Sequence, residues 1–471
     1  MSILPDIRTN FSEWYIEVID KAELASHAPV KGCIVIRPYG YALWENIQKI
    51  LDAKIKKTGH QNAAFPLLIP QSFLHKEAQH VEGFAPELAV VTHAGGKELE
   101  EPLVVRPTSE TIIHYMFAEW LRSWRDLPIK INQWCSVVRW EMRTRPFLRT
   151  TEFWWQEGHT AHETLEEARE EVDTMLQVYV DLIENYLAIP VVAGIKSETE
   201  RFAGADVTCT VEGLMQDGKA LQMGTSHMIS QNFAQAFNMK FQDKDGTISY
   251  PHLTSWAVTT RLLGALIMTH GDQKGLIMPP KIAPIQVVII PIITARTKEV
   301  VMRAAEQLYH QLSHELRVTL DTAEETPGAK LYKWELKGVP LRIEIGQRDI
   351  TNNQVTVSSR LSSEKITCSR DTIVEYVHKQ LDNLQNTLLE SARERRASMW
   401  HIREKIKDFQ DMLEQHGGFY QTGWCRDIAC EEVIKSYKAT IRCLLPQQHT
   451  QKYCCNCNKE SSGDILVAKA Y

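Results

Sequence analysis

The segment that decides the fold reads Val137-Val-Arg-Trp-Glu-Met-Arg-Thr-Arg-Pro-Phe-Leu-Arg-Thr-Thr-Glu-Phe-Trp-Trp-Gln-Glu-Gly-His159. Both of its ends are rich in Val, Phe and Trp, which suit a pleated and half-buried surface. Its middle contains Arg143, Arg145, Pro146 and Arg149. We therefore predict a hairpin of two strands joined by a basic loop that can grip an anion.

The side chains of a strand alternate between its two faces, so every second residue shares a face. On the first strand, one face carries Arg139 and Glu141. On the second strand, the residues that share a face are Phe153, Trp155, Glu157 and His159. The sequence thus predicts a wall that combines cations, carboxylates and aromatic rings.

Arg139-x-Glu141, followed by a loop and Arg149-x-x-x-Phe153, resembles motif 2 of the class II aminoacyl-tRNA synthetases. Further blocks resemble those of the prolyl-tRNA synthetase family, in that family's order: Arg106-Pro-Thr-Ser-Glu110, Trp154-Trp-Gln-Glu-Gly-His159, Gln222-Met-Gly-Thr-Ser-His227, and Thr259-Thr-Arg261 with His270-Gly-Asp-Gln-Lys-Gly275. One block alone would be weak, whereas four in order, followed by a C-terminal cysteine cluster, are difficult to obtain by chance.

The resemblance covers essentially the whole chain and implies three domains. Residues 1–283 would form an α+β catalytic domain on an antiparallel sheet, which is the class II synthetase fold. After the proline-rich segment Pro279–Pro284, strands alternate with helices, and residues 284–389 would form a small α/β anticodon-binding domain. Residues 390–471 would form a zinc-binding α+β domain, which resembles that of the archaeal and eukaryotic type of the family.

Hydrophobic periodicity and end signals predict the main elements. We expect helices over residues 9–25, 41–57, 165–187, 255–269, 298–316, 327–337, 373–389 and 390–416. After residue 284 we expect strands at 286–292, 317–321, 341–345 and 354–358. Residues 62–70 are expected to be a strand interrupted by prolines, which belong at sheet edges and ends. With the helix before it, this segment and Pro66 resemble motif 1, which builds the dimer interface in the family; on motif 1 alone, an ordinary edge strand is the simpler interpretation.

The composition is that of an ordinary globular protein, with 44% apolar and 24% charged residues. The formal net charge of −6 argues against a general nucleic-acid coat, but it does not exclude a face on which basic residues gather to bind RNA. Met1–Arg8 lacks the basic and apolar regions of a secretory signal. The longest apolar stretch, Ile285–Ile293, is too short to cross a bilayer. We predict a cytoplasmic protein with no membrane partner.

The sequence has neither a G-x-x-x-x-G-K-[S/T] loop nor a dinucleotide fingerprint, so nucleotide binding needs another arrangement. The resemblance supplies one, in which arginines of motifs 2 and 3 hold the phosphates of a bent ATP together with Mg²⁺. These catalytic roles fall on Arg139 and Arg261, with Glu141 beside them. The resemblance implies that the ATP-binding residues are Arg139, Glu141, Arg149, Thr151, Phe153, Gln222, Thr225, Thr259 and Arg261.

The resemblance also implies that L-proline is the substrate and tRNA(Pro) the acceptor. The implied proline-binding residues are Thr108, Glu110, Arg139, Trp155, Glu157, His159, Phe202 and His227. Proline's carboxylate is already ionised at neutral pH, so its attack on the α-phosphorus needs alignment and charge neutralisation rather than a general base. For Trp155 and Phe202, simple core packing remains an alternative. A metal pair of His159 and His162 is rejected, because the sequence offers no third ligand nearby.

Five of the ten cysteines lie between Cys425 and Cys457. Cys425-x4-Cys430 and Cys455-x-Cys457 give four soft ligands for a tetrahedral structural Zn²⁺. Cys454 and Cys443 are alternative ligands, so the register is open by one residue. Unliganded thiols are the competing interpretation, but five exposed thiols in so short a segment would be open to oxidation.

In the region that resembles an anticodon-binding domain, the end of a predicted strand carries Arg342, Glu344 and Arg348. These side chains could read base edges of a tRNA, although a solvated rim would have the same pattern. Gln347 stands where many relatives have proline, which leaves the local turn open.

About 60 residues separate His159 from Gln222, and bacterial-type prolyl enzymes place a large editing domain in that interval. We therefore expect an enzyme that does not edit in cis. We expect a prolyl enzyme that acts as a homodimer, and two other classes of protein are the alternatives. A threonyl-type synthetase would need an active-site zinc, for which these blocks hold no cysteine and histidine set. A non-catalytic RNA-binding relative would not need the arginines that hold the triphosphate.

Overall fold

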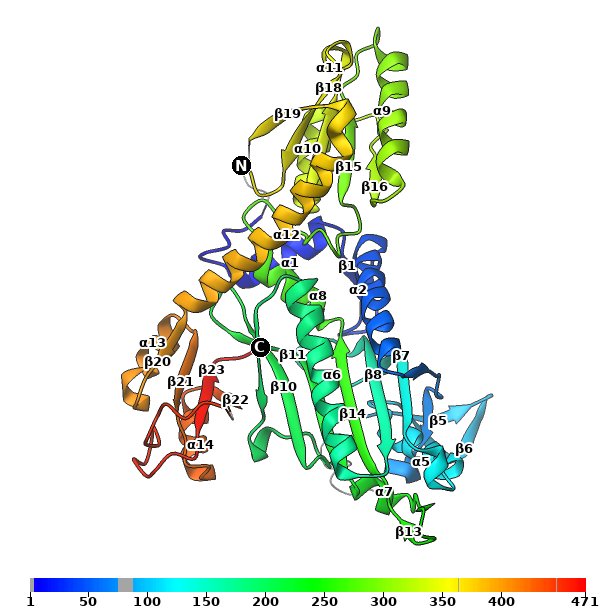
Figure 1. Cartoon of the computed structure of the whole chain (residues 1–471), viewed down its shortest axis with the longest axis vertical. Helices are drawn as coiled ribbons and strands as arrows, with labels where there is room; N and C mark the ends of the chain where they lie inside the picture. The colour runs from blue at the N-terminus through cyan, green and yellow to red at the C-terminus, as the bar shows by residue number, and fades with distance from the viewer. Residues whose placement is uncertain (1–3, 75–87, 363, 446) are drawn as a thin grey trace.

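The structure of the chain is a computed structural model, which describes residues 4–74, 88–362, 364–445 and 447–471. Figure 1 shows a body built on a large sheet, an α/β unit above it and a C-terminal unit at the lower left. Helix α12 (Ile373–Ser398) connects the upper unit to the C-terminal unit. Among the described residues, no helix combines the length and the apolar character needed to cross a membrane.

An eleven-stranded sheet runs through the body and the C-terminal unit. Its strands, in spatial order, are β20 (Trp400–Ile402), β21 (Phe419–Gly423), β23 (Asp464–Ala468), β22 (Thr440–Leu445), β9 (Val191–Ile195), β10 (Val207–Leu214), β11 (Ala220–Ser230), β14 (His252–Thr259), β8 (Glu152–His162), β7 (Ile129–Val138) and β3 (Gln61–Asn62). Neighbours pair antiparallel except where β20 meets β21 and β3 meets β7. The antiparallel sheet expected from the sequence is confirmed.

Strands β7 and β8 form the predicted hairpin, in which Val138 lies opposite Glu152. In the basic loop 139–151, the backbones of Arg145 and Arg149 exchange hydrogen bonds with N···O distances of 2.6 and 2.9 Å. The other edge of β8 pairs with β14, so the hairpin lies inside the sheet. The loop therefore projects from a rigid base.

Helix α6 (Leu165–Asn185) covers one face of this sheet (Figure 1). It begins at a capping box formed by Thr164 and Glu167, and its buried stripe includes Val172, Met175 and Tyr179. The stripe belongs to the main hydrophobic core. Because apolar packing fills this side, the polar side chains of β8, β11 and β14 are left to form a site on the other side.

The predicted helix over 255–269 is wrong in its first half. Residues up to Thr259 belong to strand β14, and helix α8 (Arg261–His270) begins after Thr260. The reason is pairing: β14 lies between β8 and β11, so Ser255–Ala257 have strand partners on both sides and Val258 and Thr259 pair with β8. This turn places Arg261 at the start of a helix that faces the motif 2 hairpin.

The predicted helix over 390–416 is also wrong. Helix α12 already begins at Ile373 and ends at Ser398, and strand β20 and the short helix α13 (Gln410–Gln415) follow it. Apolar residues at helical spacing, from Val377 to Ala392, keep α12 continuous. The predicted domain boundary at residue 389 consequently falls inside a helix.

The upper unit is an α/β sheet with the strand order β16-β15-β17-β18-β19. Its elements are β15 (Val287–Pro291), α9 (Lys298–Ser313), β16 (Val318–Leu320), α10 (Pro327–Leu336), β17 (Leu341–Ile345), α11 (Gln347–Thr351), β18 (Gln354–Ser359) and β19 (Lys365–Ser369), followed by α12. The four strands expected after residue 284 are confirmed, whereas α11 and β19 were not predicted. Gln347, where the sequence left the local structure open, is the first residue of helix α11.

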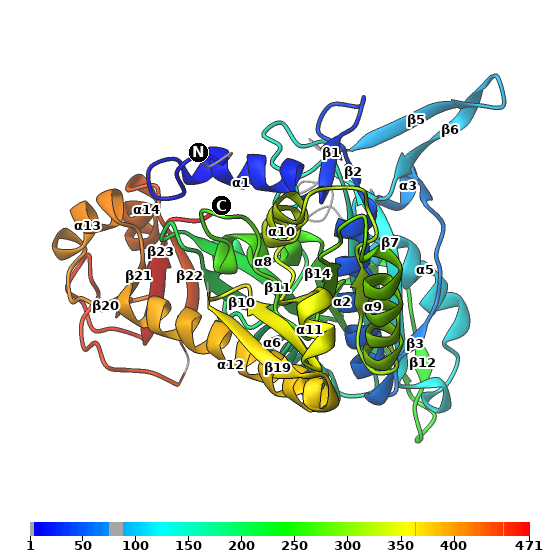
Figure 2. The ribbon, with the colours of Figure 1, turned by 90° about the horizontal axis from the view of Figure 1, so that it is seen from above.

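The N-terminal part surrounds the body. Its elements are α1 (Phe11–Lys21), β1 (Ala25–His27), β2 (Ile34–Ile36), α2 (Pro38–Lys57), β4 (Leu68–Pro70), α3 (Gln71–Leu74), β5 (Ala89–Ala94), β6 (Lys97–Val105) and α5 (Glu110–Trp120). The predicted interruption of the strand over 62–70 is confirmed, because β3 and β4 belong to different sheets. Figure 2 shows that the ribbon of β5 and β6 projects from the body.

Buried ions join the C-terminal unit to the body. Glu212 on β10 is fully buried and accepts two hydrogen bonds, at 2.8 and 3.0 Å, from the guanidinium of Arg442 on β22. Lys196 Nζ lies 2.9 Å from the other carboxylate oxygen. Removing one partner of such a buried pair would leave an uncompensated buried charge, which typically lowers the free energy of unfolding by about 3 to 5 kcal/mol. The C-terminal unit is therefore an extension of the large sheet rather than a separate appendage.

Candidate active site and cysteine cluster

A cavity of about 420 Å³ opens on the face of the sheet opposite α6. The β7–β8 hairpin, β10, β11, β14 and the start of α8 supply most of its wall. It collects nearly all residues that the sequence predicted to bind substrates, namely Thr108, Glu110, Arg139, Glu141, Arg149, Phe153, Trp155, Glu157, His159, Phe202, Gln222, Thr225, His227, Thr259 and Arg261. Two predicted sets, one for ATP and one for proline, thus share one space.

Thr151 is the exception, and its predicted place is taken by Thr150. The backbone N–H of Thr151 donates to Gly32 O at 2.9 Å, and its carbonyl accepts from Arg139 N at 2.8 Å. Its hydroxyl donates to Lys31 O at 3.4 Å, away from the cavity. The resemblance implied Thr151, but residue 151 precedes the first residue of β8, and its backbone N–H pairs with Gly32.

One end of the cavity is strongly basic. Arg261 donates through Nε to Leu148 O at 3.1 Å and through Nη1 to Gln222 O at 3.3 Å. Burial, together with the nearby charges of Arg149 and Arg139, lowers the pKa of Arg261 to about 10. These guanidiniums repel one another across the cavity, so a polyanion placed between them would relieve the repulsion.

Arg139 is held in the wall by its neighbours. Its Nε donates to Pro107 O at 3.0 Å, and its guanidinium carbon lies 5.4 and 5.6 Å from the ring centroids of Phe153 and Trp155. Both distances allow a cation–π contact. The carbonyl of Pro107 and the two rings hold the arginine side chain in the cavity wall.

The other end contains a buried network around Glu157, which is 2% exposed. Its carboxylate accepts hydrogen bonds from Ser109, from Gln133 Nε2 at 2.8 Å and from His159 Nε2 at 3.0 Å. Burial alone would raise the pKa of Glu157, but the contacts with His159, Ser109 and Gln133 outweigh it and hold the pKa below its usual value. Burial opposes the charged form of His159 as well, and the hydrogen bond and charge of Glu157 raise its pKa nonetheless. The two form an internal ion pair.

The remaining wall of this end is formed by a neutral histidine and an aromatic ring. His227 Nδ1 lies 3.0 Å from Thr208 Oγ1, and the ring centroids of His227 and Phe202 are 4.7 Å apart. Burial, with a smaller contribution from His159, lowers the pKa of His227 to about 3, so its imidazole is neutral at neutral pH. The hydroxyl of Thr108 donates to Glu110 at the edge of the same space. A small ring-shaped ligand would therefore meet aromatic faces and a carboxylate.

Sequence reasoning missed several residues of this site. Ser109 and Gln133 hold Glu157, Thr208 holds His227, and Glu200 and Thr150 line the cavity. The signal for Ser109 was its place in the block Arg106–Glu110. The positions of Gln133 and Thr208 follow from strand register, which sets Gln133 opposite Glu157 and Thr208 opposite His227.

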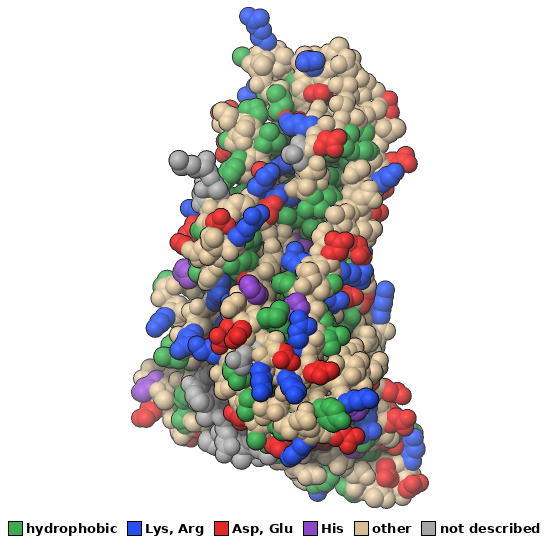
Figure 3. Space-filling model, turned by 90° about the vertical axis from the view of Figure 1, so that its left-hand side faces the viewer, with side chains coloured by type: hydrophobic (Ala, Val, Ile, Leu, Met, Phe, Trp, Pro, Cys, Tyr) green, Lys and Arg blue, Asp and Glu red, His purple; other side chains and the backbone are tan. Residues whose placement is uncertain are grey.

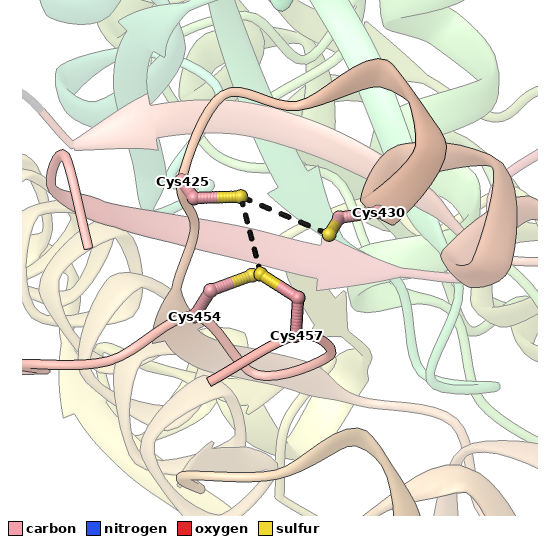
Figure 4. Close-up of side chains that lie close together, drawn as sticks. All are labelled: Cys425, Cys430, Cys454 and Cys457. Carbon is pink, nitrogen blue, oxygen red and sulfur yellow. Dashed lines mark hydrogen bonds between the residues drawn. The ribbon is translucent and has the colours of Figure 1, made fainter. Parts of the chain in front are cut away.

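Four cysteine sulfurs converge in the C-terminal unit (Figure 4). The sulfurs of Cys425, Cys430, Cys454 and Cys457 all lie within 4.8 Å of one another, and Cys425 Sγ is 3.7 Å from Cys430 Sγ and 3.6 Å from Cys457 Sγ. A tetrahedral zinc with bonds of about 2.3 Å sets its sulfurs roughly 3.8 Å apart, so the cluster fits this ion.

The prediction of Cys455 as the fourth ligand is wrong, and Cys454 takes its place. The two residues are adjacent in the chain, and it is the sulfur of Cys454 that lies within 4.8 Å of the other three. Cys455 is 3% exposed and packs in the hydrophobic core of the C-terminal unit, and its N–H donates to Gly423 O at 2.9 Å. Cys443 is fully buried in another core cluster and takes no part in the sulfur group.

The structure gives the three residues expected to read an anticodon different surroundings. Arg342 is 7% exposed and lies 3.5 Å from Glu335, which argues against a base contact. Glu344 forms an ion pair with Lys365, and Arg348 is exposed on α11. On the face of the molecule in Figure 3, lysines and arginines are interspersed with acidic side chains and do not gather in one basic patch.

Three family profiles match successive parts of the chain. They are the tRNA synthetase class II core domain (G, H, P, S and T) over residues 91–270, the anticodon binding domain over residues 286–380, and the prolyl-tRNA synthetase C-terminal domain over residues 406–471. A protein named proline–tRNA ligase 2 from Clostridioides difficile (strain 630) is 52% identical over 466 residues, which cover 98% of this chain and 96% of that protein. The chain belongs to the proline–tRNA ligase family.

Other members agree over the full length. A proline–tRNA ligase from Alkaliphilus oremlandii (strain OhILAs) is 52% identical over 99% of this chain and 97% of its own. A crystal structure of prolyl-tRNA synthetase from Cryptosporidium parvum, complexed with halofuginone and AMPPNP, superimposes with a TM-score of 0.94 at 42% identity and covers 100% of this chain and 99% of that one. The family, the enzyme class and the fold predicted from the sequence are thus confirmed.

Proposed function

We propose that the cavity binds L-proline and ATP, joins them as prolyl-adenylate, and passes the prolyl group to the 3′ end of tRNA(Pro). The observation that carries this proposal is the division of one cavity into an arginine-lined end and a paired, aromatic end. The first suits a triphosphate and the second a small amino acid. The related structure from Cryptosporidium parvum is complexed with AMPPNP, which is an ATP analogue.

In the first step, a carboxylate oxygen of proline attacks the α-phosphorus of ATP, the bond to the β-phosphate oxygen breaks, and pyrophosphate leaves. We assign Arg139 to the α-phosphate and the proline carboxylate, and Arg261 to the outer phosphates. Two-pronged guanidiniums suit this charge neutralisation. Mg²⁺ bound to the phosphates would supply further neutralisation. Glu141, Arg149, Phe153, Thr225, Thr259 and Gln222 complete the assigned ATP wall.

In the second step, a ribose hydroxyl of the tRNA attacks the prolyl carbonyl and AMP leaves. The proline end positions the substrate: Thr108 and Glu110 would hold the secondary ammonium, and Trp155, Phe202 and His227 would enclose the ring. The ion pair of Glu157 and His159 is internal, so it shapes the pocket and leaves the cationic substrate to Glu110.

The cysteine cluster supports a structural zinc site. We propose that Cys425, Cys430, Cys454 and Cys457 hold Zn²⁺ as thiolates, which would fold the loops that carry them onto the C-terminal core. A closed set of four sulfurs leaves no open position for a substrate, so its role would be structural.

The enzyme would work with two macromolecular partners, tRNA(Pro) and a second copy of itself. The match to an anticodon binding domain supports recognition of tRNA(Pro), with Glu344 and Arg348 as remaining candidates for anticodon contact. We propose that the enzyme acts in the cytoplasm, where it would supply translation, and as a homodimer through the region around Pro66. Sedimentation of the purified protein as a monomer of 54.0 kDa would contradict the dimer.

The chain has no domain inserted at the place where editing occurs in bacterial-type relatives. The described residues between His159 and Gln222 are used by the rest of β8, by α6, β9 and β10, and by the start of β11. A pocket shaped for proline discriminates against smaller amino acids by only about 1 to 3 kcal/mol for each missing methylene. We therefore expect alanine or cysteine to be activated and not corrected in cis.

Mass spectrometry after one turnover tests these assignments. Wild-type enzyme with ATP, Mg²⁺ and proline should form prolyl-adenylate and pyrophosphate in equal amounts, and addition of tRNA(Pro) should convert the adenylate to prolyl-tRNA. With alanine, a slower adenylate signal should appear, and alanyl-tRNA(Pro) should persist. Absence of any alanine adenylate would contradict the expected weak discrimination.

A further inference from the structure

The connection between β9 and β10 is part of the cavity wall. Its residues Glu200 and Phe202 line the end of the cavity assigned to proline. Phe202 N donates to Thr208 Oγ1 at 3.0 Å, and the same hydroxyl contacts His227. The position of this loop, residues 197–204, therefore decides the shape of that end.

The outer side of the loop is held by Glu431 of the C-terminal unit. Its Oε1 accepts hydrogen bonds from Ser197 Oγ at 2.8 Å and from the hydroxyl of Thr199. Lys435, one helical turn later, donates to Thr199 Oγ1 at 3.1 Å and lies 3.9 Å from a carboxylate oxygen of Glu200. Two residues of the C-terminal unit thus grip the loop that carries Glu200 and Phe202.

Glu431 directly follows Cys430, a member of the sulfur cluster. Both lie in the first turns of helix α14 (Ile428–Ser436), which Asp427 caps through a hydrogen bond to Ala429 N at 3.0 Å. A rigid helix start therefore connects the cysteine cluster to the loop. Displacement of Cys430 would displace Glu431 with it.

The chemistry of this contact is unusual for simple packing. The Glu431 side chain is 1% exposed, and its Oε2 has no hydrogen-bond partner among the described residues. Burying a carboxylate is unfavourable unless its oxygens are satisfied, and an apolar pair would fill the same space without that cost. The carboxylate of Glu431 instead orients two hydroxyl donors of the loop at once, those of Ser197 and Thr199.

We infer that Glu431 is a positioning residue for the amino acid site: it holds loop 197–204 so that Glu200 and Phe202 form the proline end of the cavity. This inference rests on the proposed assignment of that end to proline. It makes the cysteine-bearing unit a determinant of amino acid binding, although no residue of the cluster touches the cavity.

Steady-state ATP–pyrophosphate exchange tests the inference. Glu431→Ala should raise the KM for proline about 5-fold to 10-fold, the usual range for loss of a charge-assisted contact that fixes a binding residue, while the KM for ATP changes less than about 2-fold. Glu431→Gln should restore most of the affinity, because its amide oxygen can still accept from Ser197 and Thr199. Hydrogen exchange of the loop amides should quicken in Glu431→Ala and not in Glu431→Gln.

Two further variants control the experiment. Ser436→Ala lies on the same helix, with an exposed side chain whose hydroxyl donates to Val433 O, and it should leave both KM values unchanged. The double variant Ser197→Ala with Thr199→Val removes the same contact from the loop side and should reproduce the proline effect if Glu431→Ala folds poorly. Metal content should stay at the wild-type level in every variant.

The outcomes separate two failures. Wild-type protein without proline-dependent exchange would overturn the proposed function itself. An active wild type, with a proline KM that is unchanged in Glu431→Ala and in the double variant, would overturn only the positioning role. Equal increases in the KM for ATP and for proline would also overturn it, because they would indicate a general loss of structure.

Discussion

The arginine wall of the cavity and the cysteine cluster solve the same electrostatic problem in different ways. Each brings groups of like charge together, cationic guanidiniums in one case and thiolates in the other, and each would bind a ligand of opposite charge. Arg139 and Arg261 are spread around a cavity of about 420 Å³ and held by backbone carbonyls. The four sulfurs lie within 4.8 Å of one another.

This difference distinguishes a site that binds and releases its ligand in every reaction cycle from a site that would keep its ligand. Arginines anchored to the backbone keep their places when the ligand leaves, so the cavity can bind ATP and release AMP repeatedly. Sulfurs in contact with one another would repel as thiolates without a central cation, so a metal ion bound there would be part of the fold. Mutations in the wall should therefore change rate more than stability, and mutations in the cluster should do the reverse.

The largest effect is expected for Arg261→Ala. Loss of a preorganised group at the phosphates should lower kcat/KM in proline-dependent ATP–pyrophosphate exchange about 10²-fold to 10³-fold. The midpoint of thermal unfolding should hardly change, because removal of Arg261 also removes its repulsion with Arg139 and Arg149. Arg261→Lys should recover only part of the rate, since lysine lacks the two-pronged geometry.

If Arg261→Ala kept more than about a tenth of the wild-type rate, its loss of rate would be far smaller than expected, and the comparison would lose its basis. The same holds for a variant that is inactive only because it unfolds. Circular dichroism on the same sample distinguishes the two.

The next effect concerns the cluster. Cys454→Ser should lose bound zinc, and its thermal unfolding midpoint should fall by more than about 5 °C, because the binding free energy of a structural metal contributes to folding. Cys455→Ser is the matched control, since its sulfur lies outside the cluster and its side chain packs in a core. Metal analysis by mass spectrometry and a melting curve check both. Zinc lost from Cys455→Ser and retained by Cys454→Ser would reverse the assignment.

A smaller effect is expected from the proline end, whose histidine is kept neutral. The pKa of His227 falls to about 3 in the folded state, below the value of about 6.5 for an unfolded histidine. Its contribution to stability is therefore fully present above about pH 6.5 and is lost as the pH falls toward 3, by up to about 1.4 kcal/mol for each pH unit. His227→Gln should flatten the pH dependence of the free energy of unfolding by about one proton. An unchanged slope in urea titrations between pH 4 and pH 7 would contradict the burial of a neutral imidazole.

The smallest effect distinguishes two adjacent threonines. Thr150→Val changes the cavity wall and should raise the KM for ATP about 2-fold to 5-fold, in line with the modest value of one neutral polar contact. Thr151→Val should leave that KM within error, because the Thr151 hydroxyl faces Lys31. The opposite order in exchange assays would show that the sequence-based choice of Thr151 was right.

The sequence predicted most of the site because the blocks that carry it are local. Phe153 and Trp155 owe their common direction to the period of a strand, which can be read from a few residues. Arg139 and Glu141 were expected on the first strand, but β7 ends at Val138, and both residues lie in the loop that follows it. The helix that was expected over 255–269 failed because Ser255–Thr259 is apolar enough for either element, and only its two neighbouring strands decide between them.

What the sequence could not supply is the relation between distant segments. Gln133 meets Glu157 through the register of two strands, and Glu431 meets Ser197 across more than two hundred residues. The choice between Cys454 and Cys455 depends on the path of an irregular turn, for which no periodicity exists. These contacts arise in the folded chain, and they are the ones that position the side chains named by the motifs.

The central claim is that the arginine wall and the paired end of one cavity together activate proline. Amino-acid-dependent ATP–pyrophosphate exchange, measured with each of the twenty amino acids and without tRNA, tests it most directly. The account predicts exchange with proline far above that with any other amino acid, and weak exchange with alanine or cysteine. No exchange with any amino acid, from folded protein that contains zinc, would contradict it.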